Sequence, residues 1–142
     1  NMTRLLGSNN IEFRGRVSDK EKRRLLAGCL GLILPSHQRS EAFGMVLIEA
    51  AMLGKPMISC EIGTGTSFVN TDGETGIVVE PDNPAALAAA MNRLFEDGVL
   101  ARRYGLAARE RYRKIFSADA LGRAHAALYR GSIHDMTPVQ GN

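Results

Sequence analysis

Short apolar runs alternate along the chain with longer segments whose apolar residues recur at helical spacing. The runs that predict strands are Ile11–Phe13, Leu30–Leu34, Met57–Cys60 and Ile77–Val79. The segments that predict helices are 18–28, 43–53, 84–95, 99–116 and 118–129. Strands that alternate with helices in this way are typical of βαβ units. The pattern therefore predicts an α/β fold, a doubly wound parallel sheet flanked by helices, with a helical C-terminal third.

The 142 residues suffice for one domain with a buried core. We expect residues 1–131 to form that domain and 132–142, which lack periodicity, to form a tail. Leu30–Leu34 is expected to be buried on both faces, as strands of parallel sheets are. Four strands make a small sheet of this type, and no strand–helix unit precedes Ile11. We therefore expect an N-terminally truncated, C-terminal module.

Composition narrows the class of protein. With 44% hydrophobic and 23% charged residues the chain is globular rather than disordered, and no apolar run reaches the ~20 residues of a membrane span. The net charge of +3 fits an anionic small molecule, whereas the absence of Trp argues against nucleic acid. Cys29 and Cys60 are too few for a disulfide framework or a metal site and indicate reduced thiols. These features predict a cytoplasmic protein.

Two carboxylates stand out in the second predicted helix and in the loop before it. Glu49 is the single charged residue of an apolar segment, and a buried carboxylate requires a partner or a ligand. Glu41 lies eight positions earlier, where a strand gives way to a helix. Ligands of open α/β sheets bind at such loops, and a helix N-terminus favours phosphate. Carboxylates that bind sugar hydroxyls beside a phosphate site suggest a nucleotide-sugar ligand.

The segment that contains both acids reads EAFGMVLIE at 41–49 and continues AAMLGKP at 50–56. It resembles the E-x7-E signature of retaining glycosyltransferases of the GT-B fold, family four. Further blocks stand in the family's order: FRGRVS at 13–18, PS at 35–36, DGETGIVV at 72–79 and NPAAL at 83–87. The resemblance covers about residues 10 to 116, and the ordered set is more specific than E-x7-E alone.

In such enzymes this domain binds the nucleotide-sugar donor, and the resemblance implies roles for the matching positions. Glu41 is the expected catalytic-site carboxylate, in contact with the donor sugar, and Glu49 is expected to accept the ribose hydroxyls. Asp19 stands where some guanine-using relatives place an acid that accepts the N–H groups of the base. The other implied donor-binding residues are Arg16, Val17, Lys22, His37, Phe43, Gly44, Met45, Val46, Gly63, Thr64 and Gly65.

Plainer interpretations stand beside these roles. Glu49 is also explained by a salt bridge to a Lys or Arg, and Asp19 by capping of a helix that starts at Ser18 or Asp19. His37 fits a solvated loop, and Gly63–Gly65 a simple turn between strand and helix. The basic face of the predicted C-terminal helices fits either solvent or a peripheral contact with anionic lipids. Its residues are Arg102, Arg103, Arg109, Arg111, Arg113 and Lys114.

The chain also departs from the family pattern. The turn GTGTSFVN at 63–70 replaces the usual Gly-Gly-x-x-Glu type and resembles that of bacterial mannosyl- and rhamnosyltransferases that build lipopolysaccharide O-chains. The family's Arg/Lys pair that grips the diphosphate has no match. The N-terminal acceptor domain has no counterpart here either, so we expect the chain alone to be inactive.

The resemblance implies retaining transfer of mannose or D-rhamnose from a GDP-sugar to a polysaccharide or lipid-linked acceptor. No metal or other cofactor is expected. The expected partners are the donor, the glycan acceptor and the N-terminal domain of the same enzyme, with peripheral contact at the inner face of the membrane and no nucleic acid. Two alternatives stay open: a UDP-sugar-dependent glycosyltransferase, and a non-catalytic nucleotide-binding or oligomerising module.

Overall fold

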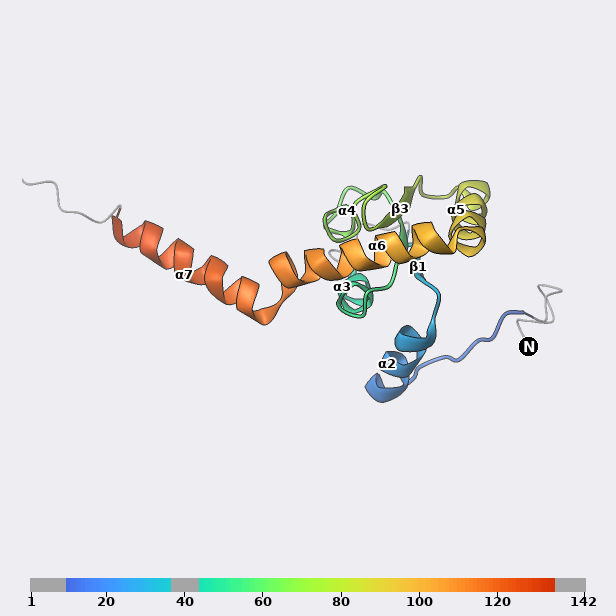
Figure 1. Cartoon of the computed structure of the whole chain (residues 1–142), viewed down its shortest axis with the longest axis horizontal. Helices are drawn as coiled ribbons and strands as arrows, with labels where there is room; N and C mark the ends of the chain where they lie inside the picture. The colour runs from blue at the N-terminus through green and yellow to red at the C-terminus, as the bar shows by residue number, and fades with distance from the viewer. Residues whose placement is uncertain (1–9, 37–43, 135–142) are drawn as a thin grey trace, which may run out of the picture.

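The computed structural model describes residues 10–36 and 44–134, and its elements alternate as the sequence predicts (Figure 1). In chain order they are α2 (Asp19–Gly28), β1 (Leu32–Leu34), α3 (Met45–Met52), β2 (Met57–Cys60), α4 (Thr66–Val69), β3 (Gly76–Val79), α5 (Pro84–Glu96), α6 (Gly98–Arg111), the π-helical turn η1 (Tyr112–Phe116) and α7 (Ala118–His134). The strands form one parallel sheet in the order β1-β2-β3. The predicted α/β class, parallel sheet and helical C-terminal third are confirmed.

Helices cover both faces of the sheet. Successive strand side chains alternate between the faces, so Met57 and Ile58 of β2 belong to different core clusters. The Met57 cluster joins α2, α3 and the C-terminal half of α6; its buried members are Leu26, Leu47, Ala50, Ala51, Met57, Val69 and Ala108. The Ile58 cluster joins α5 and the start of α6; its buried members are Ile58, Ala90, Leu94, Leu100, Ala101 and Tyr104.

Helix α6 packs against the segment that enters β2. A Cβ built on Gly105 would lie 2.2 Å from the carbonyl oxygen of Gly54 and 3.5 Å from Cδ of Pro56. Only glycine permits this approach of two backbones, and Pro56 directly precedes β2. The contact therefore places α6 beside the amino end of the central strand. The loops that follow the strands leave from the opposite side of the sheet, at the carboxyl ends of the strands.

A buried polar side chain joins β2 to β3. Asn70 is fully buried, and its amide donates to the Ser59 hydroxyl at 2.9 Å and to the Ile77 carbonyl at 3.2 Å. The Thr75 hydroxyl donates back to Asn70 Oδ1 at 3.0 Å. A buried network that is satisfied in this way fixes one register. The sequence pattern had indicated no role for Asn70.

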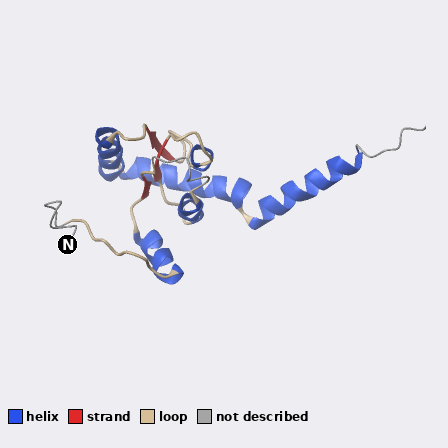
Figure 2. Ribbon diagram, turned by 180° about the vertical axis from the view of Figure 1, so that it is seen from behind, coloured by secondary structure: helices blue, strands red, loops and turns tan. Residues whose placement is uncertain are grey.

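The chain leaves the sheet through a long helical segment that projects as an arm, seen from both sides in Figures 1 and 2. The sequence predicts one α-helix through Phe116, but its last turn, η1, is a π-helix in which the Ser117 N–H donates to the Tyr112 carbonyl at 2.9 Å. The Ser117 hydroxyl then accepts the Ala120 N–H at 3.2 Å and caps α7. Ser117 therefore ends one helix and starts the next.

Several predicted details are wrong. Ile11–Phe13 is not a strand: within the described residues it has no strand partner, and Ile11 and Phe13 are 43% and 52% exposed. Strand β1 is half-buried rather than buried on both faces, because it is the edge strand of the described sheet. Helix α7 continues through 132–134, three residues into the predicted tail; residues 135–142 lie outside the described part.

Candidate functional site

The loops after β1 and β2 leave the same edge of the sheet, because the two strands are parallel and Leu34 aligns with Ser59. In open α/β sheets that edge carries the ligand crevice. Three predicted site residues of the first loop, His37, Glu41 and Phe43, lie outside the described residues. The structure therefore leaves their predicted roles untested.

Gly44 and the start of α3 stand at this edge. Gly44 is buried and has a φ of 60°, and a Cβ there would lie 2.9 Å from Cδ2 of Leu34. The positive φ favours glycine at this position, and a Cβ would in addition force the side chains of Leu34 and Leu47 to shift. No side chain caps the helix, and the backbone N–H groups of Met45 and Val46 belong to its first turn. Such N–H groups suit an anionic ligand, as the sequence predicted for this segment.

Helix α3 is less buried than its composition predicts. Leu47, Ala50 and Ala51 face the core, but Met45 is 66% and Met52 38% exposed. An apolar composition such as that of 43–53 predicts a helix that is buried on nearly all sides, and this expectation is wrong. Its apolar exposed residues flank Glu49 in sequence, so the carboxylate lies at the border between core and surface.

Glu49 pairs with Lys22 of α2. The Lys22 Nζ lies 3.0 Å from Glu49 Oε1, with 38% and 32% of the two side chains exposed. The hydrogen bond to Glu49 is the largest cause that raises the pKa of Lys22. The second carboxylate oxygen, Oε2, is buried and has no hydrogen-bond partner among the described residues. The salt-bridge interpretation of Glu49 is thus correct for one oxygen, while the predicted contact of Glu49 with the ribose stays a prediction.

Asp19 belongs to the same group of charges. Ser18 is the N-cap of α2, since its hydroxyl accepts the Glu21 N–H at 3.3 Å, so the capping interpretation of Asp19 is wrong. The Asp19 side chain is 90% exposed and lies 3.6 Å from Lys22 Nζ. Its carboxylate therefore keeps the capacity to accept hydrogen bonds from a ligand.

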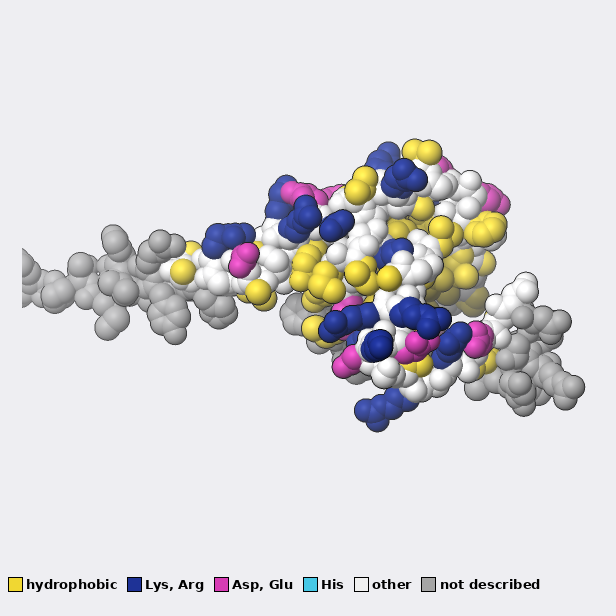
Figure 3. All heavy atoms as spheres, turned by 60° about the horizontal axis from the view of Figure 1, so that its bottom comes forward, with side chains coloured by type: hydrophobic (Ala, Val, Ile, Leu, Met, Phe, Trp, Pro, Cys, Tyr) yellow, Lys and Arg dark blue, Asp and Glu magenta, His cyan; other side chains and the backbone are white. Residues whose placement is uncertain are grey.

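A cavity of about 200 Å³ between α2 and α3 is lined by Asp19, Lys22 and Glu49, together with a fourth charged residue, Arg23. Its lining residues are Asp19, Lys22, Arg23, Leu26, Glu49, Met52 and Leu53. Arg23 is not among the residues that the sequence predicted for the site, although its spacing from Asp19 and Leu26 places all three on one face of a helix. Arg16 and Val17 lie directly before α2, the first exposed and the second half-buried. Figure 3 shows Lys and Arg intermixed with Asp and Glu over α2.

The glycine-rich turn after β2 is held by a residue that the sequence analysis did not single out. Glu61 Oε1 accepts the Gly63 N–H at 3.0 Å, and Oε2 accepts the Ser67 hydroxyl at 2.7 Å. The Ser67 hydrogen bond, followed by that of Gly63, lowers the pKa of Glu61. Thr64 and Thr66 hydroxyls lie 3.3 Å apart, and Gly65 precedes α4. Glu61 thus connects Gly63 to Ser67 of α4. Its position in the sequence, directly between the strand and the glycine-rich turn, could have indicated this role.

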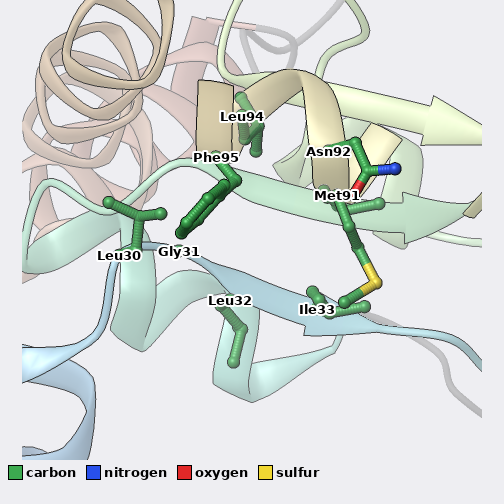
Figure 4. Close-up of a pocket in the computed structure, with 9 residues that line it drawn as sticks. Leu30, Gly31, Leu32, Ile33, Met91, Asn92, Leu94 and Phe95 are labelled. Atoms are coloured by element: carbon green, nitrogen blue, oxygen red, sulfur yellow. The ribbon is translucent and has the colours of Figure 1, made fainter. Parts of the chain in front are cut away.

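A larger cavity, about 320 Å³, is apolar and lies elsewhere (Figure 4). It begins at Leu30 and Gly31, which precede β1, and Met91 and Phe95 of α5 project over it. Among the described residues that line this cavity, Asn92 alone has a polar side chain. A diphosphate needs cations or N–H donors, which this lining does not provide. The smaller, charged cavity is therefore the better candidate despite its size.

The described residues contain neither a metal cluster nor a membrane-spanning helix. Within 10–36 and 44–134 no three His, Cys, Asp or Glu side chains are grouped as metal ligands. Over the same part of the chain, every helix is too short or too polar to cross a bilayer. The expectation that no metal is needed stays a prediction.

Comparisons with known proteins identify the family of this chain. Residues 2–111 match the model of the family described as glycosyl transferases group 1. This chain belongs to that family. It is 53% identical over 113 residues to the D-rhamnosyltransferase WbpZ of Pseudomonas aeruginosa, covering 80% of this chain. It is 45% identical over 123 residues to the O-antigen chain mannosyltransferase C of Escherichia coli, covering 87% of this chain.

Solved structures share the fold of this family member. Sucrose-phosphate synthase from Thermosynechococcus elongatus superposes with a TM-score of 0.80 at 28% identity over 94% of the chain. Anabaena HepE in complex with UDP gives 0.79 at 25% identity over 92%. The GT-B resemblance is thereby confirmed. The chain spans 30% and 33% of the two curated relatives, and 33% and 35% of the two solved chains.

Proposed function

We propose that this chain is the donor-binding part of a retaining glycosyltransferase that moves mannose or D-rhamnose from a GDP-sugar to a polysaccharide or lipid-linked acceptor. The observation that carries the proposal is the cavity between α2 and α3, where a buried oxygen of Glu49 is unpartnered among the described residues beside Asp19 and Lys22. The choice of sugar is supported by the relatives, a D-rhamnosyltransferase and a mannosyltransferase.

Each part of the site takes one part of the donor in this proposal. Glu49 accepts the ribose hydroxyls, and the exposed Asp19 carboxylate accepts the N–H groups of guanine. The first-turn N–H groups of α3 and the Gly63–Gly65 turn bind the diphosphate, because backbone donors stabilise its charge. Glu41, His37 and Phe43 complete the sugar end, and an N-terminal domain of the same enzyme holds the acceptor.

The reaction exchanges one bond at the anomeric carbon of the donor sugar. The bond from that carbon to the diphosphate oxygen breaks, and a bond to an acceptor hydroxyl oxygen forms on the same face of the ring. The hydroxyl proton goes to the leaving diphosphate. The part of this chain is to orient the donor and to stabilise charge on the leaving group, without a metal. Glu41→Ala in the full-length enzyme is expected to abolish transfer.

Calorimetric titration with GDP tests the donor site. Glu49→Gln should weaken GDP binding by about tenfold to a hundredfold, because hydrogen bonds to a charged group contribute about 1.5–3 kcal/mol. Glu96→Gln, at an exposed position of α5, is the matched control and should leave the affinity unchanged. Equal GDP affinity in Glu49→Gln and wild-type protein would refute the assignment.

A UDP-sugar donor is the second candidate, and one observation favours it: the solved complex of Anabaena HepE contains UDP. Asp19 distinguishes the candidates, because its carboxylate matches the two adjacent N–H donors of guanine better than the single one of uracil. GDP binding that exceeds UDP binding, with the preference lost in Asp19→Asn, supports the first candidate. A preference for UDP in the wild-type protein supports the second.

A peripheral membrane contact at the inner face is part of the proposal for a cytoplasmic enzyme with a lipid-linked acceptor. Not every basic residue of α6 and η1 is available: Arg111 donates to the Phe68 carbonyl and stacks on its ring, and Lys114 pairs with Glu110. Arg102, Arg109 and Arg113 are exposed, and their side chains have no described hydrogen bond or ion pair.

Vesicle binding tests this contact. Changing Arg102, Arg109 and Arg113 to Gln should lower binding to phosphatidylserine vesicles at least about tenfold, since each basic residue near an anionic surface contributes about 1 kcal/mol. The matched control neutralises three residues of α2: Lys20, Arg23 and Arg24. Equal losses in the two triple variants would show a non-specific charge effect and contradict the contact.

A further inference from the structure

Lys22 lies in the candidate donor cavity with its ammonium group already engaged. It is 3.0 Å from Glu49 Oε1 and 3.6 Å from Asp19 Oδ1. The hydrogen bond to Glu49, followed by the charges of Glu49 and Asp19, raises the pKa of Lys22 and so favours the protonated form that pairs with them. Of the three N–H donors of this ammonium group, one is given to Glu49, and Asp19 lies just beyond hydrogen-bond distance. The closest polar contact of Lys22 is thus Glu49, and this contact suggests a role for Lys22 that differs from the direct donor contact implied by the resemblance.

We infer that Lys22 is a positioning residue, which holds Glu49 by one carboxylate oxygen and so directs the other, Oε2, toward the ribose hydroxyls of the donor. The inference rests on the proposed function. It assigns Lys22 an action through Glu49 and no contact with the nucleotide.

The contacts of Glu49 support this role. A glutamate side chain has three rotatable bonds, and fixing it costs conformational entropy each time a ligand binds. The ion pair between Lys22 of α2 and Glu49 of α3 fixes the Glu49 side chain before a ligand binds, and this preorganisation lowers the entropy cost of binding. A buried acceptor without a partner is unfavourable, so Oε2 gains from a hydroxyl donor that enters the cavity.

Arg23 supplies an internal control. It follows Lys22 on α2 and lines the same cavity, but no hydrogen bond or ion pair joins it to Glu49 in the described structure. Removing either cation changes the local charge by the same amount. Only removal of Lys22 releases the carboxylate.

The experiment compares the affinities of GDP and 2′,3′-dideoxy-GDP by calorimetry in the full-length protein. We expect the wild type to prefer GDP by about tenfold or more, since dideoxy-GDP lacks the hydroxyls that Glu49 accepts. In Lys22→Met the preference should fall to near one, whereas Lys22→Arg and Arg23→Met should retain it. In steady-state kinetics, Lys22→Met should raise the donor KM and leave kcat unchanged.

Three other outcomes are possible, and they overturn respectively the role of Lys22, the role of Glu49 and the proposed function. If Lys22→Met weakens both ligands equally and keeps the wild-type preference, Lys22 contacts the ligand directly or acts only on the fold, and the inference is wrong. If the wild type binds GDP without preferring it over the dideoxy form, the proposed role of Glu49 fails, and the inference fails with it. If neither GDP nor UDP binds, the proposed function itself is wrong. Lys22 is 38% exposed, and Lys22→Ala, which also lacks the ammonium group, takes the place of the Met variant if that variant is unstable.

Discussion

Two glutamates of the candidate site differ in how many of their oxygens are used. Glu61 uses both, one for the Gly63 N–H and one for the Ser67 hydroxyl, and so shapes the turn. Glu49 uses one for Lys22 and keeps the other without a described partner. A carboxylate with all its partners inside the protein stabilises structure, whereas one with a free buried oxygen is suited to a ligand.

The pKa of Glu61 predicts a pH dependence at the residue scale. Because it is lowered from 4.5, the ionised form stabilises the folded protein above that pH, and this contribution is lost as the pH falls through the lower folded value. Between about pH 5 and pH 3 the Tm of wild-type protein should therefore decline more than that of Glu61→Gln. Thermal melts across this range measure the difference.

The control for Glu61 is Glu96→Gln, which removes an exposed carboxylate on α5. Its Tm should follow the wild-type curve. Identical acid slopes for Glu61→Gln and wild type would show that the turn draws no stability from the ionised group.

At the scale of elements, the entry into α3 depends on Gly44. Its φ of 60° is costly for other residues, and a Cβ would lie within 3.2 Å of atoms of Leu34 and Leu47. Gly73 has a φ of 71°, but a Cβ at that position would meet nothing within 4 Å. Alanine substitutions at Gly44 and Gly73 therefore distinguish the cost of backbone strain, present at both, from the cost of crowding, present only at Gly44.

Gly44→Ala is expected to lower the free energy of unfolding by about 1–2 kcal/mol for the backbone and about 1–3 kcal/mol more for crowding. Gly73→Ala should show the backbone cost alone. Urea denaturation measures both. Equal losses in the two variants would mean that Leu34 and Leu47 make room for the methyl group, and that the start of α3 is less constrained than its packing indicates.

At the scale of the whole molecule, two core clusters lie on opposite faces of one sheet and share no member. Leu47 is fully buried in the first and Ile58 is 2% exposed in the second. Helix α6 contributes to both, through Ala108 and through Tyr104. The sheet and α6 therefore make the two clusters one cooperative unit, although their side chains do not mix.

Leu47→Ala should destabilise the protein by about 2–5 kcal/mol and Ile58→Val by about 0.5–1.5 kcal/mol. The double variant should show the sum within about 0.5 kcal/mol, because the sites lie in separate clusters. Chemical denaturation of the three variants measures this. A larger deviation from the sum would show that the sheet transmits packing changes between its faces.

The sequence by itself determined the element types and the family. The periodic apolar positions in Met57–Cys60 and 84–95 reflect local backbone geometry. The order and spacing of the motifs from Phe13 to Leu87 can be read directly from the sequence. The strand expected at Ile11–Phe13 was wrong because a strand needs a partner, and pairing is not encoded in one segment.

Only the tertiary structure decided the partners of the charged residues. Lys22 and Glu49 are 27 residues apart, and packing of α2 beside α3 brings their side chains to 3.0 Å. Sequence spacing predicted that Glu49 needs a partner but not which one, since ion pairs form across space wherever the backbone places opposite charges. The same holds for Asn70, whose polarity is read from the sequence but whose burial between β2 and β3 is fixed by the fold.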